Sequence, residues 1–237
     1  MPAPQAAAIE RHPHLADPLP AGWVRVDLHS HTMWSGDSTT TPDEIAEAVR
    51  SSGIDVLCIT DHNAIKGAVD LSDALPCRVV VGEELRTHAG EIIGLFLHER
   101  IPVGAAPAEA ALAIRAQGGV VYVPHPFDPM RRNMAEPALY ELAGEGLLDA
   151  IEVVNAKTSL RSLNQRAAAF AAEFDLAAGA GSDAHVPNAL GAAYVEMPDF
   201  DGPADFLAKL RLGRVVGHHW DEHRPWTSRV VPGTTSH

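Results

Sequence analysis

Cysteine is nearly absent from this sequence, which has two among 237 residues, Cys58 and Cys77. Two cysteines cannot build the disulfide framework of a small secreted protein, so we expect buried thiols in a reducing compartment. No apolar run approaches the ~18 residues of a membrane-spanning helix. The first 20 residues lack the basic stretch and long apolar core of a secretory signal. These absences favour a cytoplasmic protein without a membrane anchor.

Basic residues are also scarce. The chain has 31 acidic and 18 basic residues, and its formal net charge is −13 at pH 7. Proteins that bind long nucleic acids usually carry a basic stripe, because neutralising phosphates supplies most of their affinity. The sequence has no such run, and we therefore expect a small substrate rather than a polymer. Carboxylates that bind cations would offset part of the acidity.

Apolar strand segments alternate with helical segments along most of the chain. We expect strands over residues 23–26, 55–60, 78–81, 91–97, 120–123, 150–154 and 176–180, with further short strands over 192–197 and 215–216. We expect helices over residues 42–52, 64–74, 107–117, 136–143, 160–174 and 203–212. The first of these helices has a capping box, Thr41-Pro42-Asp43-Glu44, and Gly53 at its end.

About seven βα repeats with nearly continuous apolar strands are typical of a parallel sheet that is buried on both faces. We expect a single α/β domain, a distorted (β/α)7 TIM-like barrel over residues 22–217. A flexible N-terminal extension (1–21) and a C-terminal tail (218–237) are expected to flank it. A doubly wound open sheet is the second choice, because its crevice gathers few strand ends.

Polar side chains of the metal-binding type stand repeatedly where a strand ends. His29 and His31 close the first strand, and alternate strand residues point to the same side, so the two imidazoles project together. Further strands end at His62, Glu84, His125, Asn155 and Asp183. Because barrels of this type have their active sites at the C-terminal ends of the strands, we expect these residues to meet.

These motifs, in this order, resemble the PHP family, named after polymerase and histidinol phosphatase. The resemblance spans roughly residues 24–195 and consists of His29-x-His31, Asp61-His62, Gly82-x-Glu84, Pro124-His125-Pro126 and Gly181-Ser182-Asp183-Ala184-His185. It implies a distorted barrel with up to three divalent metals. The implied ligands are His29, His31, Glu84 and Asp183 for the first metal, Glu84, Glu91 and His125 for the second, and Asp37, His62 and His185 for the third.

Two of these ligands depart from the family pattern. Glu91 stands where relatives often have His, and Asp37 stands where the family ligand can be His. More carboxylate shifts the preference from zinc toward manganese or iron. His88 competes with Glu91 as a ligand, and we prefer Glu91 because it directly adjoins the strand. Strand alternation is expected to send Glu83 to the opposite face from Glu84, toward solvent. We expect Asp61, Glu152 and Asn155 to contact the ligands or the substrate rather than a metal.

Clustered divalent ions suit phosphoester hydrolysis, because they lower the pKa of a bound water and neutralise the phosphoryl group. The expected protein is a metal-dependent phosphoesterase for a small phosphomonoester or compact phosphodiester, with manganese, iron or zinc. Glu84 would bridge two metals, and Asp183 or His185 would pass a proton to the leaving group. Arg131 and Arg132 are the expected phosphate contacts; further candidates are Asn155, Lys157 and Arg161.

Two alternatives remain open. Metal-dependent amidohydrolases also begin with His-x-His, but they commonly use a carboxylated lysine at a middle strand end, where this chain has His125. A non-catalytic PHP module with a structural or regulatory role would be expected to lose ligands, whereas this chain keeps nine.

Overall fold

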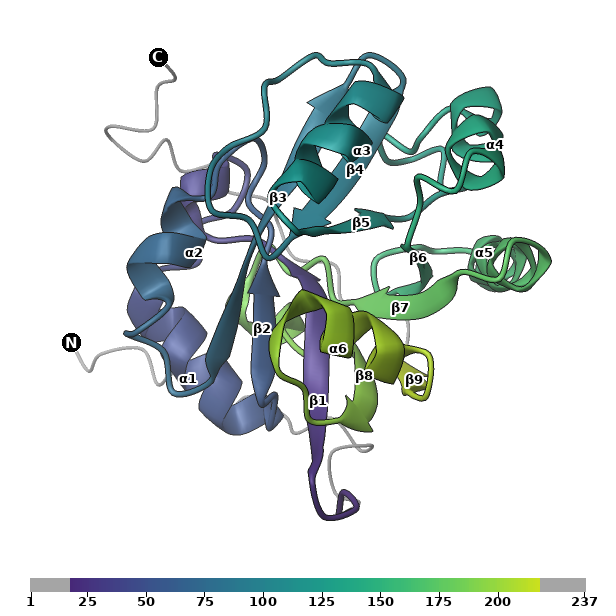
Figure 1. Cartoon of the computed structure of the whole chain (residues 1–237). Coiled ribbons are helices and arrows are strands. Elements are labelled where there is room, and N and C mark those ends of the chain that lie inside the picture. Colours follow the sequence, from purple (N-terminus) through teal and green to yellow (C-terminus); the bar gives the residue numbers. More distant parts are fainter. Residues whose placement is uncertain (1–17, 218–237) are drawn as a thin grey trace.

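The computed structural model describes residues 18–217, which form one α/β domain (Figure 1). Its strands are β1 (Trp23–Ser30), β2 (Val56–Ile59), β3 (Arg78–Thr87), β4 (Gly90–Leu95), β5 (Val120–Val123), β6 (Ala150–Asn155), β7 (Ala177–Gly181), β8 (Ala193–Pro198) and β9 (Arg214–Gly217). Its α-helices are α1 (Pro42–Ser52), α2 (Lys66–Leu71), α3 (Pro107–Ala116), α4 (Glu136–Gly144), α5 (Arg161–Glu173) and α6 (Gly202–Leu210). The expected tail (218–237), and residues 1–17 of the expected extension, lie outside the described residues.

The strands form a single sheet in the order β7-β6-β5-β4-β3-β2-β1-β8-β9. Strands β1, β2 and β3 are parallel to one another, and so are β5, β6 and β7. Strand β4 runs antiparallel to both of its neighbours, and β8 and β9 form an antiparallel pair beside β1. The barrel class that we expected is therefore confirmed, but a strict alternation of seven βα units is not found in residues 18–217.

The sheet curls until β7, at one end of the strand order, lies beside the end of β1. Just beyond β7, the Asp183 N–H donates to the His29 carbonyl at 2.8 Å, and the His31 N–H donates to the Ala184 carbonyl at 3.0 Å. The end of β1 thus has β2 on one side and the end of β7 on the other, while β8 pairs with the first half of β1. This closure brings together the strand ends that carry the ligand-type residues.

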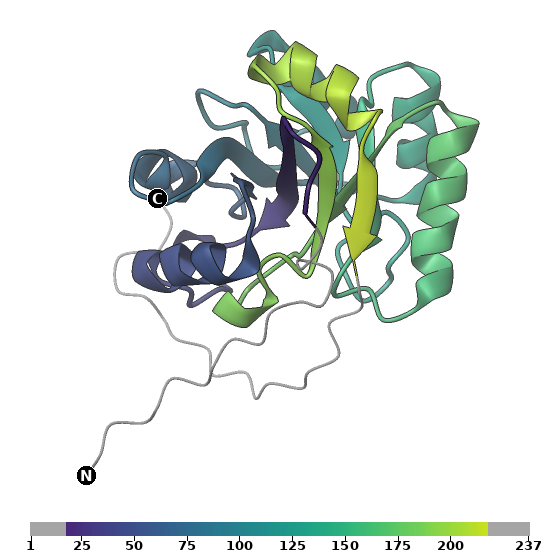
Figure 2. The ribbon, with the colours of Figure 1, turned by 90° about the horizontal axis from the view of Figure 1, so that it is seen from below.

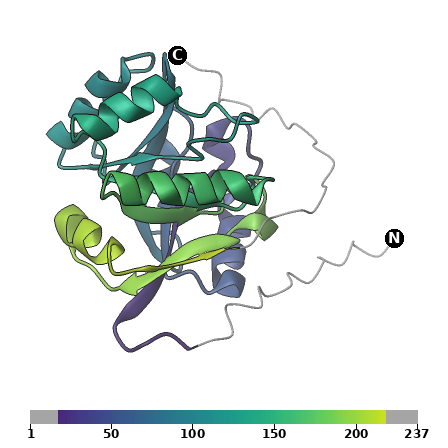
Figure 3. The same cartoon turned by 90° about the vertical axis from the view of Figure 1, so that its right-hand side faces the viewer.

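The helices lie outside the curled sheet, with α1 and α2 on one flank (Figures 1 and 2) and α3, α4 and α5 on another (Figure 3). Helix α6 lies apart from both groups (Figure 2), and its buried residues Phe206 and Leu210 pack into the same apolar cluster as β1, β2 and β5. Apolar residues fill both the barrel interior and the layer beneath the helices, which explains the continuous apolar strands. The small residues of β7 make room for a large one: a Cβ at Gly179 would lie 2.6 Å from the Tyr122 ring.

Among the described helices, none is long and apolar enough to span a bilayer. The cytoplasmic location stays a prediction.

The predicted caps of α1 form as the sequence indicates. The Thr41 hydroxyl accepts the Glu44 N–H, the Glu44 carboxylate accepts the Thr41 N–H, and Gly53 ends the helix in the left-handed conformation at φ 69°. Most other element bounds agree with the prediction to within a few residues. The exception is β3, which was expected to end at Val81 but continues to Thr87 and turns directly into β4.

Candidate metal and active site

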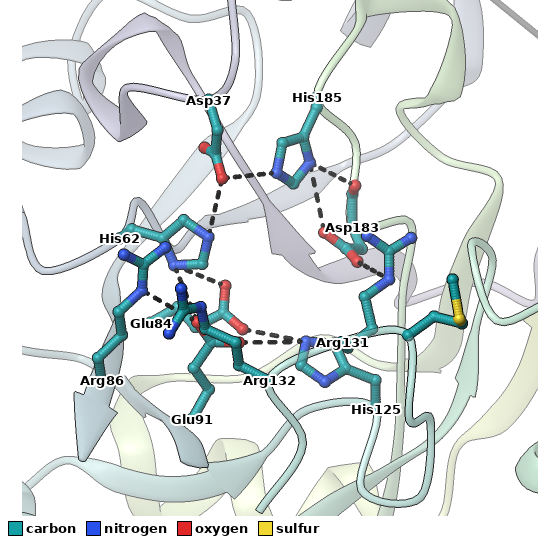
Figure 4. Close-up of a pocket in the computed structure, with 11 residues that line it drawn as sticks. Asp37, His62, Glu84, Arg86, Glu91, His125, Arg131, Arg132, Asp183 and His185 are labelled. Atoms are coloured by element: carbon teal, nitrogen blue, oxygen red, sulfur yellow. Dashed lines mark hydrogen bonds and ion pairs between the residues drawn. The ribbon is translucent and has the colours of Figure 1, made fainter. Parts of the chain in front are cut away.

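The nine side chains that the sequence predicts as ligands converge at one end of the barrel. They extend from the ends of β1, β2, β5 and β7, from the β3–β4 hairpin, and from the loop after β1; Figure 4 shows seven of them. They are His29, His31, Asp37, His62, Glu84, Glu91, His125, Asp183 and His185. Residues that are up to 156 positions apart in the sequence therefore share one small volume.

His29 and His31 project from the end of β1 with their Nε2 atoms only 3.0 Å apart. The Glu84 Oε2 atom lies 3.2 Å from both nitrogens, and Asp183 Oδ1 lies 3.4 Å from His31 Nε2. Both imidazole nitrogens thus lie close to carboxylate oxygens, and ligand atoms of His29, His31 and Asp183 are all within 4.8 Å of one another. Neutral imidazoles in contact with carboxylates are the usual ligands of first-row divalent metals, and this group fits one.

Glu84 occupies the centre of the cluster. Its Oε1 lies 3.1 Å from His125 Nε2, while its Oε2 lies 3.2 Å from His62 Nδ1. Glu91 is nearby, with Oε1 3.7 Å from His62 Nδ1 and Oε2 3.9 Å from His125 Nε2. The two oxygens of Glu84 therefore face different groups of ligands, which is the arrangement that a bridging carboxylate needs.

Asp37 joins the third group. Its Oδ2 lies 3.1 Å from His62 Nε2 and 3.4 Å from His185 Nε2. His31 also belongs to this group, because one ligand atom from each of the four residues lies within 4.8 Å of the others. Asp37 Oδ1 is buried and has no hydrogen-bond partner among the described residues, and such an orphaned oxygen fits a cation ligand.

Mutual charge interactions hold these groups in unusual protonation states. Burial would raise the pKa of Glu84, but the charges of His29 and His62 outweigh it and hold this pKa well below its usual range. Burial likewise opposes the shift at His62, where Glu84 and Asp37 raise the pKa to about 9. Burial and the neighbouring His185 lower the pKa of His31 to about 4. Perturbed values of this kind concentrate at functional sites.

Two of the ligand-type residues have left-handed backbones, His125 at φ 29° and Asp183 at φ 50°. Residues other than glycine adopt this region at a cost of roughly 1–3 kcal/mol, and they persist there where the surroundings fix them. His125 stands between Pro124 and Pro126, whose rings limit the local chain. Strain of this kind supports a functional reading of both turns.

Sequence-family models match two parts of the chain. The PHP domain matches residues 27–103, and the PHP-associated domain matches residues 161–215. Two uncharacterised proteins of Methanocaldococcus jannaschii are also similar. One is 34% identical to this chain over 200 residues, which cover 80% of each protein. The other is 39% identical over 146 residues, which cover 56% of this chain and 82% of the relative. The chain belongs to the PHP family.

Solved structures share the PHP fold at low sequence identity. A two-domain protein from Bacteroides vulgatus, described as containing a predicted PHP-like metal-dependent phosphoesterase, aligns with a TM-score of 0.66 at 18% identity, over 85% of this chain and 67% of that one. The lesion-specific endonuclease PfuEndoQ from Pyrococcus furiosus aligns with a TM-score of 0.60 at 15% identity, over 81% of this chain and 57% of that one. At these identities the likeness establishes the fold alone.

The two candidates for one ligand position in this PHP protein differ in location. Glu91 is buried at the start of β4 and belongs to the cluster, whereas His88 is exposed in the β3–β4 turn. Glu91 reaches the barrel mouth because β4 is antiparallel, so that its first residues, not its last, lie there. The geometry therefore favours Glu91.

Glu83 corrects one expectation. It points away from Glu84, as strand alternation requires, but it is 0% exposed instead of meeting solvent. Its Oε2 accepts the Ile101 N–H at 2.9 Å, and Arg100 Nε lies 3.8 Å from its Oε1. The loop before α3 covers this side of β3, which the local sequence does not reveal.

Two buried aspartates support the cluster without entering it. Asp61 accepts both the N–H and the hydroxyl of Thr32 at 2.6 Å, which fixes the chain after His31. Gly67 is needed beside it, because a Cβ there would lie 2.3 Å from Asp61 Oδ2. Asp27 accepts the N–H groups of Ser182 and Gly191 at 2.9 and 3.0 Å and ties β1 to the chain after β7.

The predicted substrate contacts lie at different depths. Arg131 lines the cavity with its Nε 3.9 Å from Asp183 Oδ2, and Arg132 lines it from an exposed position. Lys157 Nζ lies 2.8 Å from His185 Nδ1 and 3.5 Å from Asp183 Oδ1. Asn155 is 1% exposed, and its side-chain amide donates to Asp183 Oδ2. Because it is buried, it is better placed to orient Asp183 than to contact a substrate. Arg161 is exposed at the start of α5 and does not line the cavity.

Sequence reasoning missed two residues that line the cavity of about 370 Å³, Arg86 and Met130. Arg86 Nε donates to Glu91 Oε1 at 3.3 Å (Figure 4). The sequence could have indicated Arg86, which lies two residues after Glu84. Alternate residues of a strand face the same side, so Arg86 faces the side of Glu84 if β3 continues to Thr87. Met130 stands beside Arg131 and is 84% exposed, and nothing in its local sequence marks it.

Proposed function

We propose that this PHP protein is a metal-dependent phosphoesterase that hydrolyses a small phosphomonoester or a compact phosphodiester, such as a nucleotide. The observation that carries the proposal is the convergence of nine imidazole and carboxylate side chains, seven of which line a cavity together with Arg86, Arg131 and Arg132. Carboxylates attract cations and guanidinium groups attract phosphate oxygens, so the cavity suits both partners of a metal–phosphate reaction.

The proposed ligand sets are those that the family pattern implies: His29, His31, Glu84 and Asp183 for one cation, Glu84, Glu91 and His125 for a second, and Asp37, His62 and His185 for a third. The close groups of ligand atoms overlap with these sets; they are His29, His31 and Asp183; His29, Glu84 and His125; His62, Glu84 and Glu91; and His31, Asp37, His62 and His185. A mixed imidazole and carboxylate set suits manganese, iron or zinc. Two or three such cations, when bound, would supply an activated water and neutralise the phosphoryl oxygens.

The protein itself binds and orients the phosphate. Arg131 Nε is buried, lines the cavity and has no hydrogen-bond partner among the described residues. A guanidinium presents a rigid fork of donors that matches two phosphate oxygens. We assign Arg131 as the principal phosphate contact, with Arg132 at the rim, and a small substrate fits the strongly acidic chain better than a long nucleic acid.

Proton transfer to the departing oxygen is assigned to Asp183 and His185. The Lys157 ammonium lies between them, and burial lowers its pKa although the Asp183 charge opposes the shift. A lysine, an imidazole and a carboxylate in contact form a short chain of proton-holding groups at the edge of the cavity. Burial would raise the pKa of Asp183, but the charges of Lys157 and His29 hold it well below its usual range. Asp183 therefore orients the proton as a carboxylate, and His185 or Lys157 delivers it to a substrate oxygen that lies over the cluster.

The test combines metal analysis with a substrate screen. Protein stripped with chelator is reconstituted with manganese, iron(II) or zinc, analysed for bound metal, and assayed against phosphomonoesters, cyclic phosphates and nucleotides. We expect more than one cation per chain and hydrolysis of at least one of these compounds, with Glu84→Gln inactive. A chain that binds no cation after reconstitution would sink the proposal, and full cation binding without hydrolysis would favour the non-catalytic module.

A further inference from the structure

One carboxylate lies behind the proposed ligands and contacts two of them. Glu152, on β6, is 0% exposed and does not line the cavity. Its Oε1 lies 3.1 Å from His29 Nδ1, and its Oε2 accepts the backbone N–H of His125 at 2.7 Å. The two oxygens of one side chain therefore contact ligands of two different proposed cation sites.

The contact with His29 determines which nitrogen faces the cluster. The Nε2 atom of His29 is the one that approaches His31 and Glu84, at 3.0 and 3.2 Å. A ligand nitrogen must offer a lone pair, so the ring proton has to reside on Nδ1. Glu152 Oε1 is the acceptor that holds the proton there, in the manner of carboxylate–histidine pairs around metals.

The contact with His125 holds a strained turn. His125 has φ 29°, and its N–H is bound to Glu152 Oε2 at 2.7 Å. A hydrogen bond to a charged group is stronger than one between neutral groups, and it offsets the cost of this backbone conformation. The amide of Asn155 donates to the same oxygen at 2.9 Å and fixes the carboxylate in turn.

The surroundings of Glu152 argue against a role in packing alone. Among the described residues its ion-pair partner is His29, and no lysine or arginine is within ion-pair distance of it. A carboxylate buried without such a cation is expensive, and an apolar side chain would pack at lower cost. The neighbouring strand also leaves room for the contact, because a Cβ at Gly181 would lie 2.6 Å from Glu152 Oε1 and 2.3 Å from His29 Cβ.

We propose that Glu152 is a positioning residue that sets two cation sites together. It holds His29 with Nε2 toward the first site and fixes the backbone that carries His125 to the second. The inference rests on the proposed function, because it requires cations at this cluster. Removing the two acceptors of Glu152 should therefore weaken both sites at once, although no atom of Glu152 touches a cation.

The test is Glu152→Gln, which keeps the shape but has one acceptor oxygen in place of two. The amide can accept from His29 or from the His125 N–H, but not from both. We expect manganese affinity, measured by calorimetry on chelator-stripped protein, to fall by about 10- to 100-fold. Glu83→Gln is the matched control: Glu83 is also 0% exposed and accepts one backbone N–H, yet it faces away from the cluster, so its variant should bind manganese like wild type.

The outcomes separate the inference from the proposed function. Wild type that binds no manganese refutes the proposed function and this inference with it, whereas folded Glu152→Gln with wild-type affinity overturns the inference alone. If Glu152→Gln does not fold, nuclear magnetic resonance of zinc-loaded wild type decides. We expect His29 to bind zinc through Nε2 and to show an Nδ1–H that is protected from exchange, and ligation through Nδ1 would overturn the inference.

Discussion

Replacing Arg131 by alanine tests how the substrate is held. The Arg131 side chain is 28% exposed, its buried Nε has no hydrogen-bond partner among the described residues, and the nearest carboxylate oxygen, on Asp183, is 3.9 Å away. A phosphate in the cavity would give this donor its first close partner. Loss of one charge-assisted hydrogen bond costs about 1.5–3 kcal/mol, so kcat/KM for a phosphomonoester should fall by about 10- to 150-fold.

Arg132 should matter less, and the reason is structural. Its side chain is exposed, where solvent limits an ion pair to about 0–1 kcal/mol, or at most about 5-fold in kcat/KM. Its backbone carbonyl accepts the Glu91 N–H at 2.9 Å, and alanine keeps that bond. Arg131→Lys should recover only part of the lost activity, since an ammonium keeps the charge without the fork.

The assay measures kcat/KM with manganese-reconstituted protein, and elemental analysis should show unchanged metal content. Arg100→Ala is the control, because it removes one positive charge from a half-exposed side chain that pairs with Glu83 outside the cavity. Wild-type kinetics in Arg131→Ala would refute the assignment. If the double variant with Arg132→Ala were also unaffected, the phosphate contact would shift to Lys157 and Arg161.

Three further predictions concern the cations. His125→Ala should lose metal and reduce turnover by more than about 100-fold while keeping its circular dichroism spectrum, because His125 holds a proposed cation; normal turnover would show that the second site is wrongly assigned. Glu91→Ala should lose metal and His88→Ala should not, by elemental analysis; the reverse result would exchange their roles. The pKa of His62 is about 9 in the folded protein and near 6.5 in the unfolded chain, so protonation of His62 stabilises the metal-free protein. This contribution, up to about 3 kcal/mol, is fully present below pH ~6.5 and is lost as the pH rises to about 9. The melting temperature in chelator should fall over that range and fall less with manganese; a flat profile in chelator would contradict the shift.

Much of the fold could be predicted from local sequence, as α1 shows: its capping box and terminal glycine act within a few residues and form as expected. The length of β3 could not. Gly82, Glu83 and Glu84 look like the end of a strand because charged residues rarely continue one. Here pairing with β4 extends the strand, the Ile101 N–H binds Glu83, and histidines surround Glu84. All of those contacts are tertiary.

The candidate site was predictable to the extent that it depends on strand ends. His29, His62, His125 and Asp183 stand where strands finish, and the structure brings them together. Arg86 was missed because its approach to the cavity depends on the continuation of β3. Glu152 was expected to contact the ligands, and it contacts His29 and His125. Which of its oxygens meets which ligand could not be predicted, since the partners of a buried carboxylate depend on the packing of several strands.

Glu91 reaches the cluster by a route that the strand-end rule does not describe. The rule that ligands follow the C-terminal ends of strands does not cover it, because β4 runs the other way. What places it is the register of the β3–β4 hairpin, in which Arg86 is directly opposite Glu91. Opposed residues of an antiparallel pair share a face, and Arg86 shares its face with Glu84, so all three side chains enter the cavity. A slip of one residue would turn Glu91 outward and Ile92 inward, so the two-residue connection between Thr87 and Gly90 determines which side chain completes the cluster.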